Sequence, residues 1–286
     1  MKPITYFAPA KLNLTLEVLG RRSDGYHEIR SIMQAVSLGD GLTFSLSDTL
    51  SFECDLPGWN SEKSLVSRAA ALLLNESGSR KGADVRIVKR IPLASGLGGD
   101  ASDAAAVLRG LSALWSLEVP LEELAVLATG LGSDVPFFLS GSAALARGRG
   151  EIITSLPAIP KHWFVIMTPD VPRPTEKTAA VYTRLRETNY TSGIYTEALK
   201  EYLTHAEGIT DDMLYNVFEG VAYDLFPGLE GSREAMIAAG VARVHLAGAG
   251  PSLYSLHASR AEAEMVCARL AGQPVYVAEA LGSINY

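Results

Sequence analysis

Residues 91–106 read IPLASGLGGDASDAAA and carry three closely spaced glycines, at Gly96, Gly98 and Gly99. Glycine lets the backbone approach a ligand closely because it has no Cβ. The alanine-rich run that follows predicts a helix, whose first N–H groups lack partners within the helix and carry a partial positive charge. Asp84–Val88 predicts a strand. The segment is therefore a strand, a glycine-rich loop and a helix, an arrangement that favours phosphate binding.

Two common phosphate-binding motifs fit this loop poorly. The Walker A motif fails because no lysine follows the glycines. The dinucleotide fingerprint G-x-G-x-x-[GA] matches at Gly96, Gly98 and Ala101, but residues 91–95 separate the strand from the glycines where this fingerprint has a tight turn. After the predicted helix, residues 117–120 lead into another helix and not into a strand that ends in an acidic residue. A glycine turn that only caps a helix is the third interpretation.

The composition is that of a globular chain with a large core. Of the 286 residues, 48% are hydrophobic and 20% are charged, and this length favours two domains. The net charge of −7 argues against a protein whose whole surface binds nucleic acid, but it allows a local basic site for an anionic substrate. Cys54 and Cys267 lie far apart without metal-ligand spacing, which predicts buried thiols in a reducing compartment.

The sequence gives no signal for export or membrane insertion. Lys2, Pro3, Pro9 and Lys11 interrupt the N-terminal region where a signal peptide needs an unbroken apolar stretch. No run of about eighteen apolar residues is present. We therefore expect a cytoplasmic protein with neither a membrane nor a nucleic acid as a partner.

Alternating apolar and polar residues over Leu12–Val18 predict a half-buried strand, and residues 4–7 predict a shorter one. Lys11 and Asn13 fall on the polar face of the longer strand. A polar strand face is usually solvated, so the simplest interpretation of Lys11 is an exposed lysine.

The turn Arg21–His27 is basic and contains an Asp-Gly reversal. Tyr26 offers a stacking face and His27 a hydrogen-bonding edge, which together suit a planar base. A plain hairpin turn with a half-buried tyrosine is the alternative.

The remaining periodicity predicts both strands and helices. Further strands are expected at residues 42–46, 50–54, 143–146, 152–156, 163–168, 243–246, 252–256 and 275–278. Helices are expected from Ser61 or Ser64 to Gly78, over residues 120–130, from 172–175 onward, and at 196–206, 212–224, 229–239 and 259–271. Residues 157–160 form a predicted boundary between an N-terminal domain of residues 1–158 and a C-terminal domain of residues 159–286.

Two stretches together resemble a known family. They are the string AKLNLTLEVLGRRSDGYH, from Ala10 to His27, and the pattern P-x-x-x-G-L-G-G-x-x-S that starts at Pro92. Both are similar to signatures of the 4-diphosphocytidyl-2-C-methyl-D-erythritol kinases, which belong to the GHMP kinase superfamily. The resemblance continues through residues 28–34 and covers most of the first half. It implies an α+β fold with an N-terminal mixed sheet and helices, a C-terminal ferredoxin-like α+β sandwich, and an active site in the cleft between them.

The resemblance also implies an activity. Such an enzyme uses ATP with Mg²⁺ to phosphorylate a hydroxyl of the cytidine diphospho-alcohol 4-diphosphocytidyl-2-C-methyl-D-erythritol, giving the 2-phosphate, in the non-mevalonate route to isoprenoids. A monomer or homodimer is expected. The residues expected to bind the substrate are Asn13, Tyr26, His27 and Thr175. From the residues alone, Thr175 is equally a helix N-cap.

ATP is expected to bind at Lys89 and the glycine loop. The loop residues are Pro92, Leu93, Ala94, Ser95, Gly96, Leu97, Gly98, Gly99, Asp100, Ala101, Ser102 and Asp103. The resemblance places Lys89 beside the adenine, whereas an ordinary exposed lysine is the alternative.

Asp134 lies in the segment Gly132–Phe138, between a glycine and a strongly apolar stretch. The pattern alone is typical of a helix N-cap. In the family, the aspartate of G-x-D-V-P is the proposed catalytic base, and Lys11 acts with it. A carboxylate accepts the proton that an alcohol loses as it attacks phosphorus, and a lysine beside it stabilises the ionised form. The loop amides, the helix N-terminus and Mg²⁺ take up charge on the phosphates.

The chain departs from the family at three places, namely the glycine loop, Ser64 and a third motif. Asp100 and Ala101 replace glycine and serine of the loop, and a carboxylate there either points away from the phosphates or assists the metal. Ser102, which does fit the family pattern, either contacts phosphate or Mg²⁺ or caps the helix. Ser64 stands where the family has an adenine-binding asparagine. Ala247 and Ala249 replace serines of a third motif, commonly S-G-S-G, so only backbone contacts remain possible there.

Three other functions remain open at this stage. Another GHMP kinase, for a homoserine- or mevalonate-like alcohol, would share the loop but lack the D-G-Y-H turn. A non-catalytic nucleotide-binding relative would have lost Lys11 or Asp134. A dinucleotide oxidoreductase would require the weaker fingerprint match to be correct.

Overall fold

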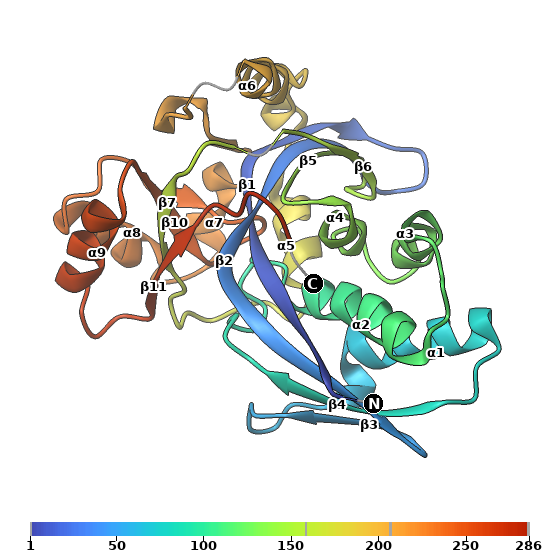
Figure 1. Cartoon of the computed structure of the whole chain (residues 1–286). Coiled ribbons are helices and arrows are strands. Elements are labelled where there is room, and N and C mark those ends of the chain that lie inside the picture. Colours follow the sequence, from blue (N-terminus) through green and yellow to red (C-terminus); the bar gives the residue numbers. More distant parts are fainter. Residues whose placement is uncertain (1, 158, 206–207, 285–286) are drawn as a thin grey trace.

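The computed structural model describes residues 2–157, 159–205 and 208–284 (Figure 1). Its first half is built on a long antiparallel hairpin of β1 (Ile4–Arg21) and β2 (His27–Ser47). The two short strands expected in the first of these segments form one strand, because the register shift between Pro9 and Ala10 absorbs the proline without ending the pairing. The sequence did not predict much of β2, because residues 31–36 are all buried and this stretch shows no alternation of apolar and polar residues.

The hairpin forms the centre of a mixed seven-stranded sheet with the order β3-β4-β2-β1-β8, and β5 and β6 extend from β2. The added strands are β3 (Leu50–Cys54), β4 (Gly82–Val88), β5 (Ala143–Gly148), β6 (Ile152–Ser155) and β8 (Tyr215–Asn216). The β3–β4 and β1–β8 pairs are parallel, and the other pairs are antiparallel. The predicted N-terminal mixed sheet is therefore confirmed.

Helices cover one face of this sheet (Figure 1). They are α1 (Leu65–Ser77), α2 (Gly99–Trp115), α3 (Leu121–Thr129) and the short α4 (Val135–Ser140). Residues 101–108 of α2 are all buried, because this helix lies between the sheet and other helices. Small side chains make this approach possible: a Cβ at Gly110 would lie 2.5 Å from the ring of Phe44.

The second half contains an antiparallel sheet with the order β11-β7-β10-β9. Its strands are β7 (Trp163–Met167), β9 (His245–Leu246), β10 (Leu253–His257) and β11 (Val275–Glu279). The helices α5 (Lys177–Arg184), α6 (Ile194–Thr204), α7 (Glu219–Leu225) and α8 (Leu229–Ala238) lie between β7 and β9 in the chain, and α9 (Arg260–Arg269) connects β10 to β11. This is the β-α-β-β-α-β order of the expected ferredoxin-like sandwich.

The two halves are tightly joined. Leu12 and Leu14 of β1 share a core with Phe164 and Ile166 of β7. In addition, β8 from the second half pairs with β1 of the first sheet. The proposed domain boundary after residue 158 falls at a position outside the described residues.

Two helix predictions in the second half are wrong in position. The helix expected over 212–224 begins only at Glu219, because Asn216 lies in β8 and its side-chain amide donates to the carbonyls of Leu246 and Gly248, each at 2.8 Å. The helix expected from 172–175 begins at Lys177, since Pro172 and Pro174 hold the residues before them extended. The helix expected at 196–206 ends at Thr204, and residue 206 lies outside the described residues.

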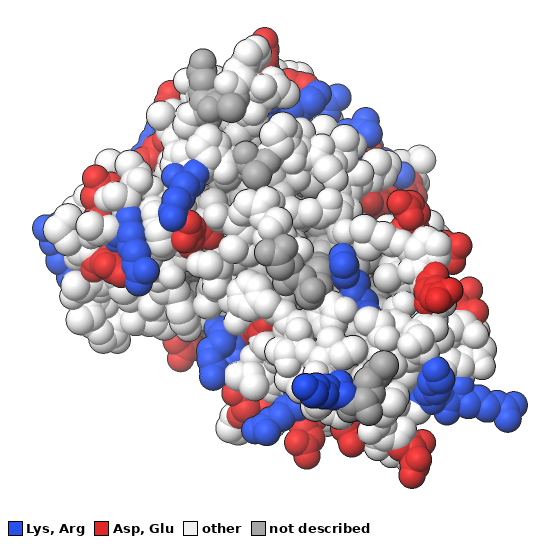
Figure 2. All heavy atoms as spheres, viewed as in Figure 1, with Lys and Arg blue, Asp and Glu red and all other residues white. Residues whose placement is uncertain are grey.

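Figure 2 shows Lys and Arg interspersed with Asp and Glu on one face, without a single basic patch on that face. Among residues 2–157, 159–205 and 208–284, no helix has both the length and the apolar character that crossing a membrane requires.

Candidate active site

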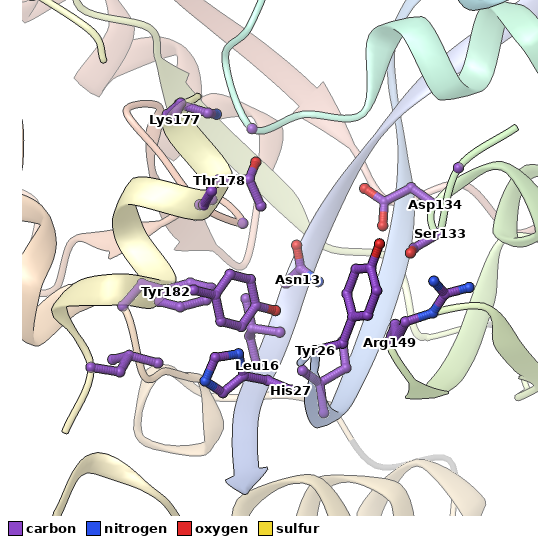
Figure 3. A pocket seen from close by; sticks show the side chains of 18 of the residues that line it. Asn13, Leu16, Tyr26, His27, Ser133, Asp134, Arg149, Lys177, Thr178 and Tyr182 are labelled. Carbon is purple, nitrogen blue, oxygen red and sulfur yellow. The ribbon is translucent and has the colours of Figure 1, made fainter. Parts of the chain in front are cut away.

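A cavity of about 870 Å³ lies where the two halves meet (Figure 3). Its walls come from β1, the glycine loop, the turn before β2, the segment before α4, α5, and the turn between β9 and β10. Residues of both predicted catalytic motifs therefore open into one space.

Lys11 and Asp134 form an ion pair in this cavity. The Lys11 ammonium lies 3.3 Å from Asp134 Oδ2 and donates to Asn13 Oδ1 at 2.6 Å. Asn13 in turn donates to the Ser31 hydroxyl at 2.7 Å, which fixes the orientation of its amide. Lys11 is only 4% exposed, so its interpretation as a surface lysine is wrong. The carboxylate is therefore held beside a positioned ammonium group.

Asp134 occupies the N-cap position of α4, as the sequence pattern indicates, but its side chain makes no capping hydrogen bond. The carboxylate reaches toward Lys11, and about a third of its surface is accessible from the cavity side of the molecule. Asp134 is thus free of a structural role that would occupy its oxygens.

The carbonyl groups of the glycine loop are bound by distant segments of the chain. The backbone N–H of Lys11 donates to Leu97 at 2.9 Å and that of Ser252 to Ser95 at 3.1 Å. The Arg173 guanidinium donates to Leu93 at 2.6 Å. In a trans peptide the carbonyl and the next N–H point in opposite directions. The N–H groups of Gly96 and Gly98, which line the cavity, therefore point away from these anchors and toward possible ligands.

Glycine is required at position 96. Its φ is +90°, and a Cβ there would lie 2.3 Å from the carbonyl oxygen of Ala247. The loop and the turn at residues 247–250 therefore touch through their backbones. The expectation that this turn reaches a ligand only through its backbone stays a prediction.

A serine hydroxyl lies buried in the first turn of α2. Ser102 Oγ is fully buried and has no hydrogen-bond partner among the described residues, and Gly98 is the N-cap, so the capping interpretation of Ser102 is wrong. An unpaired buried hydroxyl fits a site for a phosphate oxygen or a metal-bound water. Asp100 is exposed in the first turn and does not line the cavity, whereas Ala101 does.

Lys89 lies beneath the loop in a buried cluster. Its ammonium donates to Asp40 at 2.6 Å and to Asp103 at 2.7 Å, and although burial acts to lower its pKa, these two carboxylates raise it overall. Burial raises the pKa of Asp103 to about 8, although Lys89 opposes this shift. The other oxygen of Asp40 accepts from the backbone N–H of Ile91 at 2.8 Å. The alternative of an exposed lysine is wrong, and contact with adenine stays a prediction.

We expect Lys89→Met to destabilise the fold strongly, because it leaves two buried carboxylates without their cation. The free energy of unfolding should fall by about 3–5 kcal/mol, measured by urea denaturation. Lys161→Met is the matched control: this exposed lysine pairs with Glu279 of β11 at 3.0 Å, and its loss should cost no more than about 1 kcal/mol. Equal effects of the two variants would contradict a structural role for the buried cluster.

Aromatic rings line the opposite end of the cavity. His27 stacks on Tyr182, with ring centroids 4.8 Å apart and planes at 23°, and Tyr190 approaches His27 edge-on. Burial lowers the pKa of His27, which favours its neutral form, and burial raises that of Tyr182. Tyr26 is 54% exposed, and the Arg149 guanidinium lies 4.6 Å from its ring centroid. Flat rings with polar edges suit a planar base.

The structure does not place Thr175 in the cavity. Thr175 is exposed, and Glu176, not Thr175, is the N-cap of α5. Thr178 and Lys177 line the cavity instead, at the start of the helix (Figure 3). Sequence reasoning missed Lys177, Tyr182 and Arg149: no motif marks the two residues of α5, and Arg149 lies within the predicted Arg147–Gly150 turn.

Ser64 caps α1, and its hydroxyl accepts from the Val66 N–H at 3.4 Å. A second hollow of about 480 Å³ lies directly before this helix and is lined by Phe52, Cys54 and residues 58–62. Within the part of the chain that the structure describes, no cluster of three His, Cys, Asp or Glu side chains is arranged to hold a metal ion.

Comparison with known proteins agrees with this geometry. The GHMP kinases N terminal domain matches residues 64–142, and the GHMP kinases C terminal matches residues 196–275. The 4-diphosphocytidyl-2-C-methyl-D-erythritol kinase of Dehalococcoides mccartyi is 44% identical over 284 residues, which cover 99% of this chain and 100% of that protein. This chain belongs to the 4-diphosphocytidyl-2-C-methyl-D-erythritol kinase family of the GHMP kinases. The family prediction from the Ala10–His27 string and the glycine loop is confirmed.

Solved structures confirm the fold of this GHMP kinase. A crystal structure of a 4-(cytidine 5'-diphospho)-2C-methyl-D-erythritol kinase is 35% identical, with a TM-score of 0.81, and the match covers 96% of this chain and 98% of that one. A homoserine kinase from Cytophaga hutchinsonii is 20% identical with a TM-score of 0.75, over 100% of this chain and 96% of that one. The second likeness concerns the fold alone.

Proposed function

We propose that this chain transfers the γ-phosphate of ATP to a hydroxyl of 4-diphosphocytidyl-2-C-methyl-D-erythritol, giving the 2-phosphate, in non-mevalonate isoprenoid synthesis. One observation carries the proposal: the Lys11–Asp134 pair lies in a cavity with the glycine loop at one end and stacked aromatic rings at the other. A phosphate donor and a base-bearing acceptor can thus meet at the pair. Membership of the family supports this substrate.

Asp134 acts as the general base. Its carboxylate accepts the proton of the attacking hydroxyl as the oxygen bonds to phosphorus, while ADP leaves with the electrons of the broken bond. Lys11 holds the ionised carboxylate in place and offsets negative charge near the phosphoryl group. Asn13 fixes the Lys11 ammonium, so the charges are oriented before the reaction begins.

The residues present fit ATP with Mg²⁺. The N–H groups of Gly96 and Gly98, the N-terminus of α2 and the unpaired Ser102 hydroxyl would hold the phosphates and their metal. Mg²⁺ prefers oxygen ligands and often relies on phosphate and water, which agrees with a site that lacks a carboxylate cluster among the described residues. When bound, the metal neutralises charge on the β- and γ-phosphates.

In this proposal the cytosine of the acceptor would lie against His27, Tyr26 and Tyr182. Tyr26 and Tyr182 offer ring faces, and the neutral His27 offers one donor and one acceptor nitrogen. The adenine of ATP would lie in the second hollow, where the ring of Trp59 offers a stacking face. Ser64 follows this region in the chain, and the backbone N–H of Lys89 donates to Asp55 within it at 2.7 Å, but the side chains of Lys89 and Ser64 are engaged in structural contacts.

The test is ADP release from Mg-ATP with three alcohols: the cytidine diphospho-methylerythritol, mevalonate and homoserine. We expect kcat/KM for the cytidine substrate to exceed kcat/KM for mevalonate and homoserine by about 10³-fold or more. Neither of these alcohols carries a base, so the polar groups of the base site would stay unpaired when they bind. Tyr182→Ala should raise KM for this substrate about tenfold and leave KM for ATP unchanged.

Two outcomes would overturn the proposal. Preferential turnover of homoserine or mevalonate would indicate a GHMP kinase for another alcohol. ATP binding without turnover of any of the three would favour a non-catalytic relative, although the intact Lys11–Asp134 pair argues against that function.

A further inference from the structure

Lys177 is a cation that lines the cavity, and the proposed phosphoryl transfer assigns it no role. It stands at the start of α5, and its ammonium donates to the backbone carbonyls of Gly250 and of Ala94, the latter at 3.2 Å. Ala94 belongs to the glycine loop, and Gly250 to the turn that touches the loop. The lysine therefore lies where three separate segments of the active site meet.

The partners of Lys177 do not balance its charge. Both are neutral carbonyls, and the described ion pairs include no carboxylate within 4.0 Å of this ammonium. An ammonium has three donors, and these contacts use two. Lys177 is partly buried. Withdrawing a cation from water without a counter-ion is costly, so its retention beside a phosphate-binding loop points to an anionic ligand.

The charged groups around Lys177 also indicate an anionic ligand. Burial, together with the nearby Lys11 and Arg173, lowers the pKa of Lys177 to about 8, while Asp134 acts in the opposite direction. Three of these four groups are cations and one is a carboxylate, so they carry a net positive charge when all are ionised. A phosphoryl group in transfer would supply the missing negative charge.

Its position selects the phosphates of ATP over those of the acceptor. Lys177 lies at the glycine-loop side of the cavity in Figure 3, whereas His27 and Tyr182 lie at the other side. A Cβ at Gly248, in the turn that bonds Lys177, would lie 3.3 Å from the Lys11 ammonium. Lys11 and Lys177 thus both lie close to this turn.

We propose that the Lys177 ammonium binds the γ-phosphoryl group of ATP and, by exchanging the Gly250 carbonyl for phosphate oxygens, stabilises the charge in transfer. The inference rests on the proposed kinase function for its catalytic part. It assigns to the second half of the chain a direct contact with the reacting phosphate, in place of the serine hydroxyls that the third motif lacks at Ala247 and Ala249.

The experiment separates γ-phosphate contact from support of the loop. Lys177→Met removes the charge at similar length, and Lys177→Arg keeps it. Arg173→Met is the matched control, because Arg173 also donates to a loop carbonyl but does not line the cavity. The affinities of all variants for ADP and for the β,γ-imido analogue of ATP are measured by calorimetry with Mg²⁺, together with kcat and the melting temperature.

Lys177→Met should bind the ATP analogue about tenfold more weakly, bind ADP within about threefold of wild type, and lose about 100-fold in kcat. Lys177→Arg should regain part of the loss in kcat. Arg173→Met should change the two affinities by equal factors. The affinities for ADP and the ATP analogue are measured without an acceptor, so they do not depend on which alcohol is the substrate. A failure of the proposed function can therefore be distinguished from a failure of this inference.

Three results would overturn the inference. Equal losses for ADP and the ATP analogue, matching Arg173→Met, would show that Lys177 only supports the loop. A loss confined to the affinity for the cytidine substrate would place Lys177 on the acceptor. A kcat within threefold of wild type would exclude a role in transfer.

The pH dependence gives an independent readout. The groups that face Lys177 are Lys11 on β1, Arg173 before α5, and Asp134 before α4. Its ammonium is charged below about pH 8 and loses its charge as the pH rises through that value. In wild type, kcat/KM for ATP should therefore fall above pH 8, and Lys177→Arg should remove that decline. The same decline in both proteins would contradict the inference.

Discussion

Asp134→Asn should lower kcat by about 10³–10⁴-fold with little change in the folded structure. Asparagine has the same shape and is equally accepted at a helix N-cap, so α4 keeps its start. The amide cannot accept the proton of the alcohol, however. KM for ATP should stay within about threefold of wild type, because Asp134 belongs to the acceptor side of the reaction. ADP release under saturating substrates measures the effect.

The control for this substitution is Asp224→Asn on α7, an exposed carboxylate that does not line the cavity. It should leave kcat unchanged. A rate for Asp134→Asn above a tenth of wild type would show that another group, or the phosphate itself, takes the proton. Such a result would leave the fold and the family intact but would remove the base from the mechanism.

Lys11→Met should lower kcat by about 10³-fold, the second-largest effect that we expect. Methionine fills a similar volume in a position that is tightly packed: a Cβ at Gly98 would lie 3.0 Å from Lys11 Cγ. Removing the ammonium frees both Asp134 and Asn13 from their partner, so the orientation of the base and the charge near phosphorus are lost together. The melting temperature should change little, since Asp134 can be solvated.

The double variant Lys11→Met/Asp134→Asn tests whether the two residues act as a unit. Groups that work together show strongly non-additive effects. We therefore expect the double variant to be about as slow as the slower single variant. Rates that fall by the product of the two single effects would mean that Lys11 and Asp134 contribute independently, in conflict with their ion pair.

The sequence predicted those parts of the site that lie in continuous motifs. The loop from Pro92 to Asp103 and the turn at Tyr26 and His27 are local structures, in which glycine and Asp-Gly chemistry fixes the backbone. The backbone conformation of both segments could therefore be predicted without knowledge of the residues that they contact. The resemblance added Lys11 and Asp134, whose side chains meet only after the sheet and helices have formed.

The remaining part depends on tertiary contacts that have no local signal. Lys177 and Tyr182 reach the cavity because α5 starts later than its prolines suggested, and the same shift leaves Thr175 in solvent. Periodicity also failed at Asn216, where two carbonyls of the second half hold the side chain in a short strand. At Asn216, contacts between segments that are distant in the sequence override the local preference for a helix, whereas α5 begins late because Pro172 and Pro174 hold the residues before them extended.

The anchoring of the glycine loop has a consequence for how the protein is made. Leu97 is held by β1, but Ser95 is held by Ser252, which the ribosome adds more than a hundred and fifty residues later. A nascent chain that has emerged only through the first sheet therefore carries the loop sequence without all of its anchors. Nucleotide affinity should therefore appear only late in synthesis, once Ser252 has been added and has folded against the loop.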